Sequence, residues 1–157
     1  MFLAGNPLTD CLVFSCGVLA VAGTCSWISI RGVRCVPRIL IVDDDPEVRS
    51  VFRRILERDG HSITEAENGK RGSELYQAGD FDLVLMDLVM PEQEGLESIQ
   101  KIRAADPHAR IIAISGGGQD LGFEYLRMAR AFGALDALQK PVRAAELSGA
   151  VQQALKS

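Results

Sequence analysis

From Arg38 onward, the sequence predicts an α/β protein whose doubly wound parallel sheet carries helices on both faces. Five short apolar runs alternate with five amphipathic stretches, which is typical of strand–helix–strand units with right-handed crossovers. The run at residues 83–86 is apolar at every position, as expected of a parallel strand buried on both faces. These patterns favour a single compact domain built around the sheet.

The expected strands and helices alternate along the chain. The strands are expected at Arg38–Val42, Ser62–Ala66, Asp82–Asp87, Arg110–Ser115 and Asp136–Gln139. The helices are expected at Pro46–Asp59, Gly69–Gln77, Leu96–Ala105, Gly122–Phe132 and Ala144–Leu155.

Helix signals support these assignments. The apolar residues of the first expected helix recur at the spacing of one helix face; they are Val48, Val51, Phe52, Ile55 and Leu56. Asp45 is expected to cap this helix, with Pro46 at its first position, and Gly60 to end it. Asn68 is expected to cap the second helix.

Composition limits the function classes. The chain has 157 residues and a formal net charge of −4, so it offers no basic footprint for nucleic acid. All four cysteines lie in the first 35 residues. The remainder therefore has no disulfide framework, which fits a reducing, cytoplasmic environment.

The first 36 residues are expected to form a leader, separate from a domain at residues 37–157. Residues 11–30 carry no charge and are about long enough to span a bilayer as a helix. Arg31 and Arg34 follow, which would place the carboxyl side in the cytoplasm. Alternatively, the leader is disordered or is a mis-assigned start, with the natural start near Val36. The sequence leaves both interpretations open.

Acidic residues follow two of the expected strands. Asp43, Asp44 and Asp45 come directly after the first strand, and Asp87 ends the third. Two unit charges about 4 Å apart repel by roughly 4 kcal/mol at an effective dielectric near 20. A divalent cation such as Mg²⁺ relieves such repulsion. Alternatively, the first three acids only favour the start of the first helix, but the position of Asp87 favours a metal site.

Two further polar groups follow the remaining strands. Ser115 ends the fourth strand and precedes three glycines, a setting suited to an anionic oxygen. Lys140 follows the fifth strand and precedes Pro141, so it either snorkels to the surface or supplies a positive charge in the same crevice. An acidic pair, a further acid, a hydroxyl and an ammonium at four strand ends indicate a functional site more specifically than any one of these groups does alone.

The signature blocks resemble those of the receiver domain of bacterial two-component response regulators, in particular the stand-alone, chemotaxis-type regulators. The blocks are Ile39–Asp45, Leu85–Pro91 with Gly95, Ile114–Gly116 and Gly133–Pro141. The resemblance covers about residues 37–155. It implies a flavodoxin-like fold with five parallel strands in the order 2-1-3-4-5, and a signalling protein rather than an enzyme.

The resemblance also implies roles for individual residues. Asp87 matches the acceptor of a phosphoryl group from a histidine kinase. Asp44 and Asp87 match direct Mg²⁺ ligands, together with the backbone carbonyl of Val89, and Asp43 matches a ligand acting through water. Lys140 and Ser115 match the groups that bind the phosphoryl oxygens.

The partners implied are a sensor histidine kinase and either a downstream target or a histidine phosphotransfer protein, without nucleic acid. No effector module is expected after the last helix. The resemblance also allows a phosphorylation-dependent dimer through the fourth helix, fifth strand and fifth helix.

The sequence departs from the family pattern at the switch aromatic, which is Ala137 here. Tyr125 or Phe132 could substitute, but their spacing favours core packing for at least one of them. Val89 and Gly117 match positions whose side chains, in the family, influence hydrolysis of the phosphoryl group, and neither residue offers a side chain that could position a water. Ala137 motivates an alternative function as a phosphorylation-independent adaptor. An aspartyl-phosphate phosphatase is disfavoured, because Val89 replaces its second acid.

Overall fold

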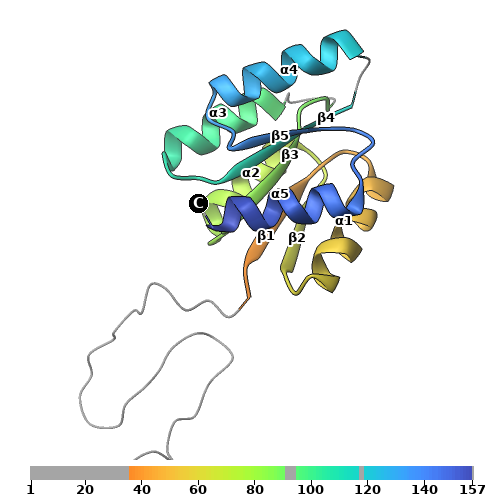
Figure 1. Cartoon of the computed structure of the whole chain (residues 1–157). Coiled ribbons are helices and arrows are strands. Elements are labelled where there is room, and N and C mark those ends of the chain that lie inside the picture. Colours follow the sequence, from red (N-terminus) through yellow and green to blue (C-terminus); the bar gives the residue numbers. More distant parts are fainter. Residues whose placement is uncertain (1–35, 91–94, 117–118, 157) are drawn as a thin grey trace, which may run out of the picture. The chain divides into compact units, whose positions relative to one another are not determined.

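The structure, a computed structural model, describes residues 36–90, 95–116 and 119–156, and five strands alternate with five helices in this part of the chain (Figure 1). The strands are β1 (Arg38–Val42), β2 (Ser62–Ala66), β3 (Leu83–Asp87), β4 (Ile111–Ser115) and β5 (Asp136–Gln139). The helices are α1 (Pro46–Arg58), α2 (Gly69–Ala78), α3 (Gly95–Ala105), α4 (Gln119–Ala131) and α5 (Ala144–Lys156).

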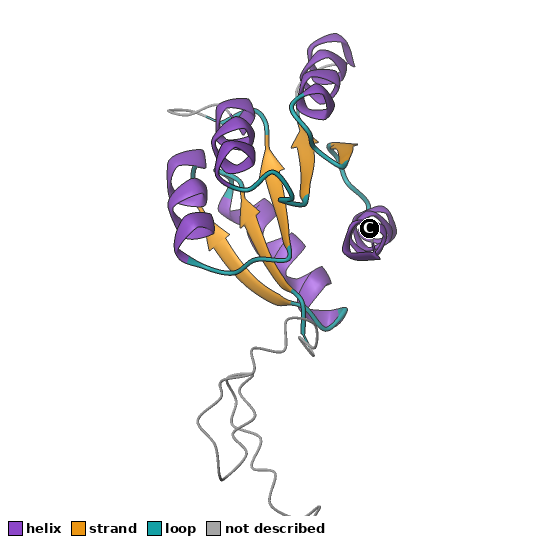
Figure 2. Cartoon of the chain, turned by 90° about the vertical axis from the view of Figure 1, so that its left-hand side faces the viewer, coloured by secondary structure: helices purple, strands orange, loops and turns teal. Residues whose placement is uncertain are grey.

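The strands form one parallel sheet in the order β2-β1-β3-β4-β5, with helices on both of its faces (Figure 2). This arrangement confirms the predicted flavodoxin-like fold. Each expected strand and helix is present, and most boundaries agree to within one residue. The exception is α4, which begins at Gln119 rather than at Gly122. Glycine has a low helix propensity, but the helix includes Gly122 all the same.

Two apolar clusters cover the two faces of the sheet. On one face, Ile39 and Ile41 of β1 pack with residues of α1 and α5, such as Leu56 and Leu147. On the other face, Leu40 and its neighbours on β1, β3 and β4 pack with residues of α2, α3 and α4. Since successive residues of a central strand enter opposite clusters, each of β1, β3 and β4 contains a continuous run of four apolar residues.

The predicted caps are confirmed. The Asp45 carboxylate accepts hydrogen bonds from the backbone N–H groups of Glu47 and Val48, at 2.8 and 3.4 Å. Asn68 caps α2 by accepting from the Arg71 N–H at 2.8 Å. Gly60 has a φ of +91°, a left-handed conformation that stops the chain from continuing as a helix after α1.

Gly95 allows α3 to approach the carboxyl end of β3. A Cβ atom at this position would overlap the carbonyl oxygen of Asp87 and would lie 2.7 Å from the Leu88 Cα atom. Both neighbours are backbone atoms and cannot rotate away. The glycine therefore sets the distance between α3 and the strand that ends in Asp87.

The expected leader at residues 1–36, including the candidate membrane segment at 11–30, lies outside the described residues except for Val36. Among the helices that are described, none combines the length and the apolar character needed to cross a membrane.

We expect Gly95→Ala to lower the free energy of unfolding by at least about 1–3 kcal/mol, because the new methyl group displaces backbone. Gly149→Ala is the matched control, since a methyl group at this exposed position of α5 would meet no atom within 4 Å. The control should be stabilised by about 0.5–1 kcal/mol. Urea unfolding of both variants measures the difference, and equal stabilities would contradict the close approach.

Candidate functional site

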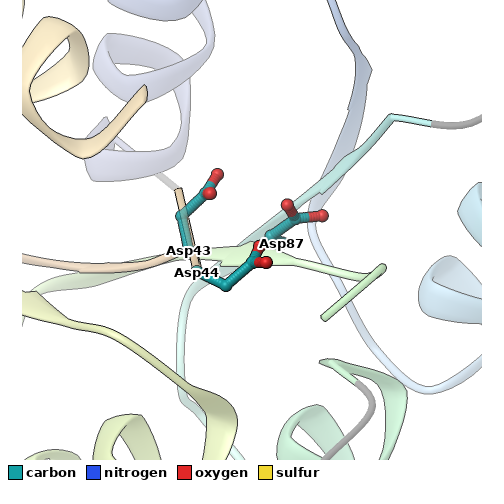
Figure 3. Close-up of side chains that lie close together, drawn as sticks. All are labelled: Asp43, Asp44 and Asp87. Atoms are coloured by element: carbon teal, nitrogen blue, oxygen red, sulfur yellow. The ribbon is translucent and has the colours of Figure 1, made fainter. Parts of the chain in front are cut away.

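Three carboxylates meet at the carboxyl edge of the sheet (Figure 3). The parallel pairing of β1 with β3 sets Val42 beside Met86, so the next residues, Asp43 and Asp87, lie at the same level at the carboxyl edge of the sheet. Asp44 follows Asp43 in the loop that leads to α1. The meeting predicted from the two strand ends is therefore present in the structure.

The geometry of the three acids suits a small divalent cation. One oxygen from each of Asp43, Asp44 and Asp87 lies within 4.8 Å of the others. Asp43 and Asp87 are only 1% and 3% exposed, whereas Asp44 is exposed and leaves the cluster open to solvent. Carboxylate oxygens are the ligands that Mg²⁺ prefers, and it retains water on its remaining positions. The donor set therefore fits Mg²⁺.

The ammonium group of Lys140 joins the two buried carboxylates. It donates to Asp43 Oδ2 at 2.7 Å and to Asp87 Oδ2 at 2.5 Å. The second oxygen of each acid accepts a backbone N–H, from Asp45 to Asp43 and from Val89 to Asp87, both at 3.0 Å. Of the two roles predicted for Lys140, the structure shows the second: the side chain supplies a positive charge within the crevice and does not snorkel to the surface.

The electrostatics reflect this crowding. Burial raises the pKa of Asp43, and the charge of Asp87 raises it further, against the lowering effect of the hydrogen bond from Lys140. Partial burial acts to lower the pKa of Lys140, but its hydrogen bonds to Asp43 and Asp87 outweigh this effect and raise the pKa. The lysine therefore stays charged, and its ammonium contacts two of the three carboxylates of the cluster.

Ser115 lies on the same edge of the sheet. Asp87 pairs with Ile114 on β4, so Ser115 projects one residue further along the strand, and its backbone carbonyl accepts the Lys140 N–H at 2.8 Å. The side chain is 0% exposed, and its hydroxyl has no hydrogen-bond partner among the described residues. A buried hydroxyl without a partner is costly and uncommon. It is available to a ligand oxygen.

The remaining predicted residues have three different outcomes. Tyr125, Phe132 and Ala137 all pack against the apolar cluster on the α4 side of the sheet, which confirms the expected core packing of the aromatic residues. Val89 is exposed beside the site, and metal binding by its carbonyl stays a prediction. Gly117 lies outside the described residues.

Arg49 was not identified from the sequence. Its guanidinium group donates to the backbone carbonyls of Asp43, at 2.7 Å, and of Asp44, at 3.2 Å. The available signal was its position four residues after the cap Asp45, since long helical side chains lean back over the preceding turn. An arginine on the first turn of an amphipathic helix is common, so the position alone does not indicate this contact.

Comparison with known proteins identifies relatives of the whole described domain. The family model described as "Response regulator receiver domain" matches residues 39–152. Chemotaxis protein CheY of Bacillus subtilis is 38% identical over 119 residues, which cover 75% of this chain and 97% of the relative. Chemotaxis protein CheY of Halobacterium salinarum is 36% identical over 118 residues, covering 75% and 96%.

Solved structures agree with this result. A CheY-like response regulator receiver domain protein from Methanospirillum hungatei superposes with a TM-score of 0.72 at 28% identity, covering 77% of this chain and 94% of that one. Response regulator TrrA from Thermotoga maritima, solved in complex with Mg²⁺ and BeF, has a TM-score of 0.68 at 30% identity, covering 76% and 99%. With its acidic cluster at the expected edge of the sheet, the chain belongs to the response regulator receiver domain family of two-component signalling.

Proposed function

We propose that this receiver domain, at residues 37–157, accepts a phosphoryl group from a sensor histidine kinase on Asp87. As a receiver domain, it is not a conventional enzyme. The observation that carries the proposal is the environment of Asp87. A nearly buried carboxylate shares one lysine with a second acid, close to an exposed third acid and to the Ser115 hydroxyl, which has no partner in the described part of the chain.

Four groups are proposed to hold the cation. Asp44, Asp87 and the backbone carbonyl of Val89 would hold Mg²⁺ directly, and Asp43 would contact it through water. When bound, Mg²⁺ offsets the repulsion between the attacking carboxylate and the phosphoryl oxygens. Asp44 is the exposed member of the acidic cluster, so a hydrated ion reaches the site from its side.

The transfer itself uses the residues of the chain. An oxygen of Asp87 attacks the phosphorus, the bond from phosphorus to the imidazole nitrogen of the donor breaks, and that nitrogen keeps the electron pair. The product is an acyl phosphate. Lys140, already in contact with Asp87, then pairs with one phosphoryl oxygen. The hydroxyl of Ser115 donates to another, which satisfies the buried group.

The proposed output follows from the movement of Ser115 toward the phosphoryl group. Ser115 is the last residue of β4, and α4 begins at Gln119, so a shift of Ser115 changes the surface of α4, β5 and α5. This surface then binds a downstream protein or a second copy of the chain. Alternatively, Asp87 passes the phosphoryl group on to a histidine phosphotransfer protein. Because Ala137 lies at the usual position of the switch aromatic, rotation of a Tyr or Phe side chain at that position cannot carry the signal.

Adding Mg²⁺ is expected to stabilise the fold, because the native cluster binds the ion better than the unfolded chain does. At ~100-fold excess over Kd, the gain in unfolding free energy is about 2.7 kcal/mol. Asp44→Asn should lose most of this gain. Urea unfolding with and without MgCl₂ measures it, with potassium chloride at equal ionic strength as the control. The same gain in the variant as in the wild type would contradict the proposed ligand set.

Incubation with acetyl phosphate and Mg²⁺ is expected to add about 80 Da to the intact chain. The adduct should be absent from Asp87→Ala and should not form in the presence of EDTA. Intact-mass spectrometry provides the measurement. The proposal fails if the wild type gains no mass or if Asp87→Ala gains the same mass. A wild type without an adduct would favour the phosphorylation-independent adaptor.

A further inference from the structure

The acidic loop after β1 is held in place by a side chain of α1. Arg49 lies one turn into this helix, and its Nη1 atom donates to the backbone carbonyls of both Asp43 and Asp44. These residues carry two of the three carboxylates of the cluster (Figure 3). The side chain of Arg49 is only 15% exposed, so its position is restricted by packing.

Arg49 is itself anchored to the neighbouring strand. Its Nε atom donates to Glu65 Oε2 on β2 at 3.3 Å. The backbone N–H of Asp43 donates to the Ala66 carbonyl, also on β2, at 3.2 Å. The peptide groups on both sides of Asp43 therefore have fixed partners, and two of these contacts lead to β2.

We propose that Arg49 is a positioning residue for the cation site, which it serves by fixing the peptide groups that carry Asp43 and Asp44. The inference rests on the proposed function, because it concerns the same Mg²⁺ ligands. Ligands held before binding lose little conformational freedom when the ion arrives, and this raises affinity. Arg49 touches neither the ion nor the phosphoryl group in this account.

The positive charge of Arg49 lowers the affinity for Mg²⁺, whereas its positioning of the loop raises that affinity. A guanidinium near the acidic cluster disfavours a second cation, although its pairing with Glu65 offsets part of this effect. Removal of the charge alone would tighten Mg²⁺ binding, whereas loss of positioning would weaken it. The sign of the change in affinity therefore separates the two effects.

Arg53 provides a matched control on the same helix. It lies one turn after Arg49 and shares its partner, since Arg53 Nη1 donates to Glu65 Oε1 at 3.1 Å. Its Nε atom donates to Glu57 at 2.8 Å, and its side chain is 49% exposed. Arg53→Gln thus removes an arginine and an ion pair with Glu65 while the contacts between Arg49 and the loop carbonyls stay in place.

The test compares Mg²⁺ affinity in the full-length wild type, Arg49→Gln and Arg53→Gln by isothermal titration calorimetry with MgCl₂. We expect Arg49→Gln to raise the Kd for Mg²⁺ by about tenfold. Arg53→Gln should change it by less than about twofold. Phosphorylation of Arg49→Gln by acetyl phosphate should be slow at limiting Mg²⁺ and should recover at saturating Mg²⁺. A purely structural role would not produce this recovery.

Equal affinities in the two variants, or tighter binding by Arg49→Gln, would overturn the inference. A wild type that takes up no Mg²⁺ would overturn the proposed cation site, and the inference with it. If Arg49→Gln does not fold, Arg49→Lys replaces it. Lysine keeps the charge, but its single nitrogen cannot bond the two loop carbonyls and Glu65 together, as Nη1 and Nε of arginine do. Weaker binding by Arg49→Lys than by the wild type supports the inference, and unchanged or tighter binding overturns it.

Discussion

The site depends on one interaction, the contact of the Lys140 ammonium with the carboxylates of Asp43 and Asp87. Both acids are almost fully buried, and removing two like charges from water at one sheet edge is costly. The lysine compensates for part of that cost. Asp44 adds a third carboxylate on the open side, so the cluster remains suited to a further cation. In our proposal, the excess of negative charge binds Mg²⁺, and the ion would offset the repulsion between Asp87 and the phosphoryl oxygens.

The rest of the fold sets the positions of the acids, Lys140 and Ser115 relative to one another. Parallel pairing aligns the ends of β1 and β3, and β4 places Ser115 one residue beyond Asp87. Gly95 lets α3 pack against the backbone at the end of β3. Arg49 and Glu65 link the acidic loop to α1 and β2. Several different elements thus support one carboxyl edge, whereas apolar packing on the two faces supports the sheet itself.

The sequence was most informative where local pattern and tertiary position agree. The uninterrupted apolar run at residues 83–86 predicted β3, and parallel topology then predicted that Asp87 would meet the acids after β1. Contacts that depend on long side chains were less accessible. The bonds of Arg49 to two carbonyls, and the missing partner of the Ser115 hydroxyl among the described residues, follow from tertiary distances that no spacing reveals. The Mg²⁺ ligand set and the individual roles in phosphoryl transfer stay predictions.

The central claim is that the carboxylates at this edge require positive charge, which Lys140 and Mg²⁺ supply together. The most direct measurement compares the unfolding free energy of Lys140→Met with that of the wild type, without and with MgCl₂. We expect the variant to lose about 1–3 kcal/mol without Mg²⁺ and to gain more than the wild type when Mg²⁺ is added. Lys101→Met, which removes an exposed helix ion pair with Glu97, is the control. An equal or smaller gain in Lys140→Met than in the wild type would contradict the account.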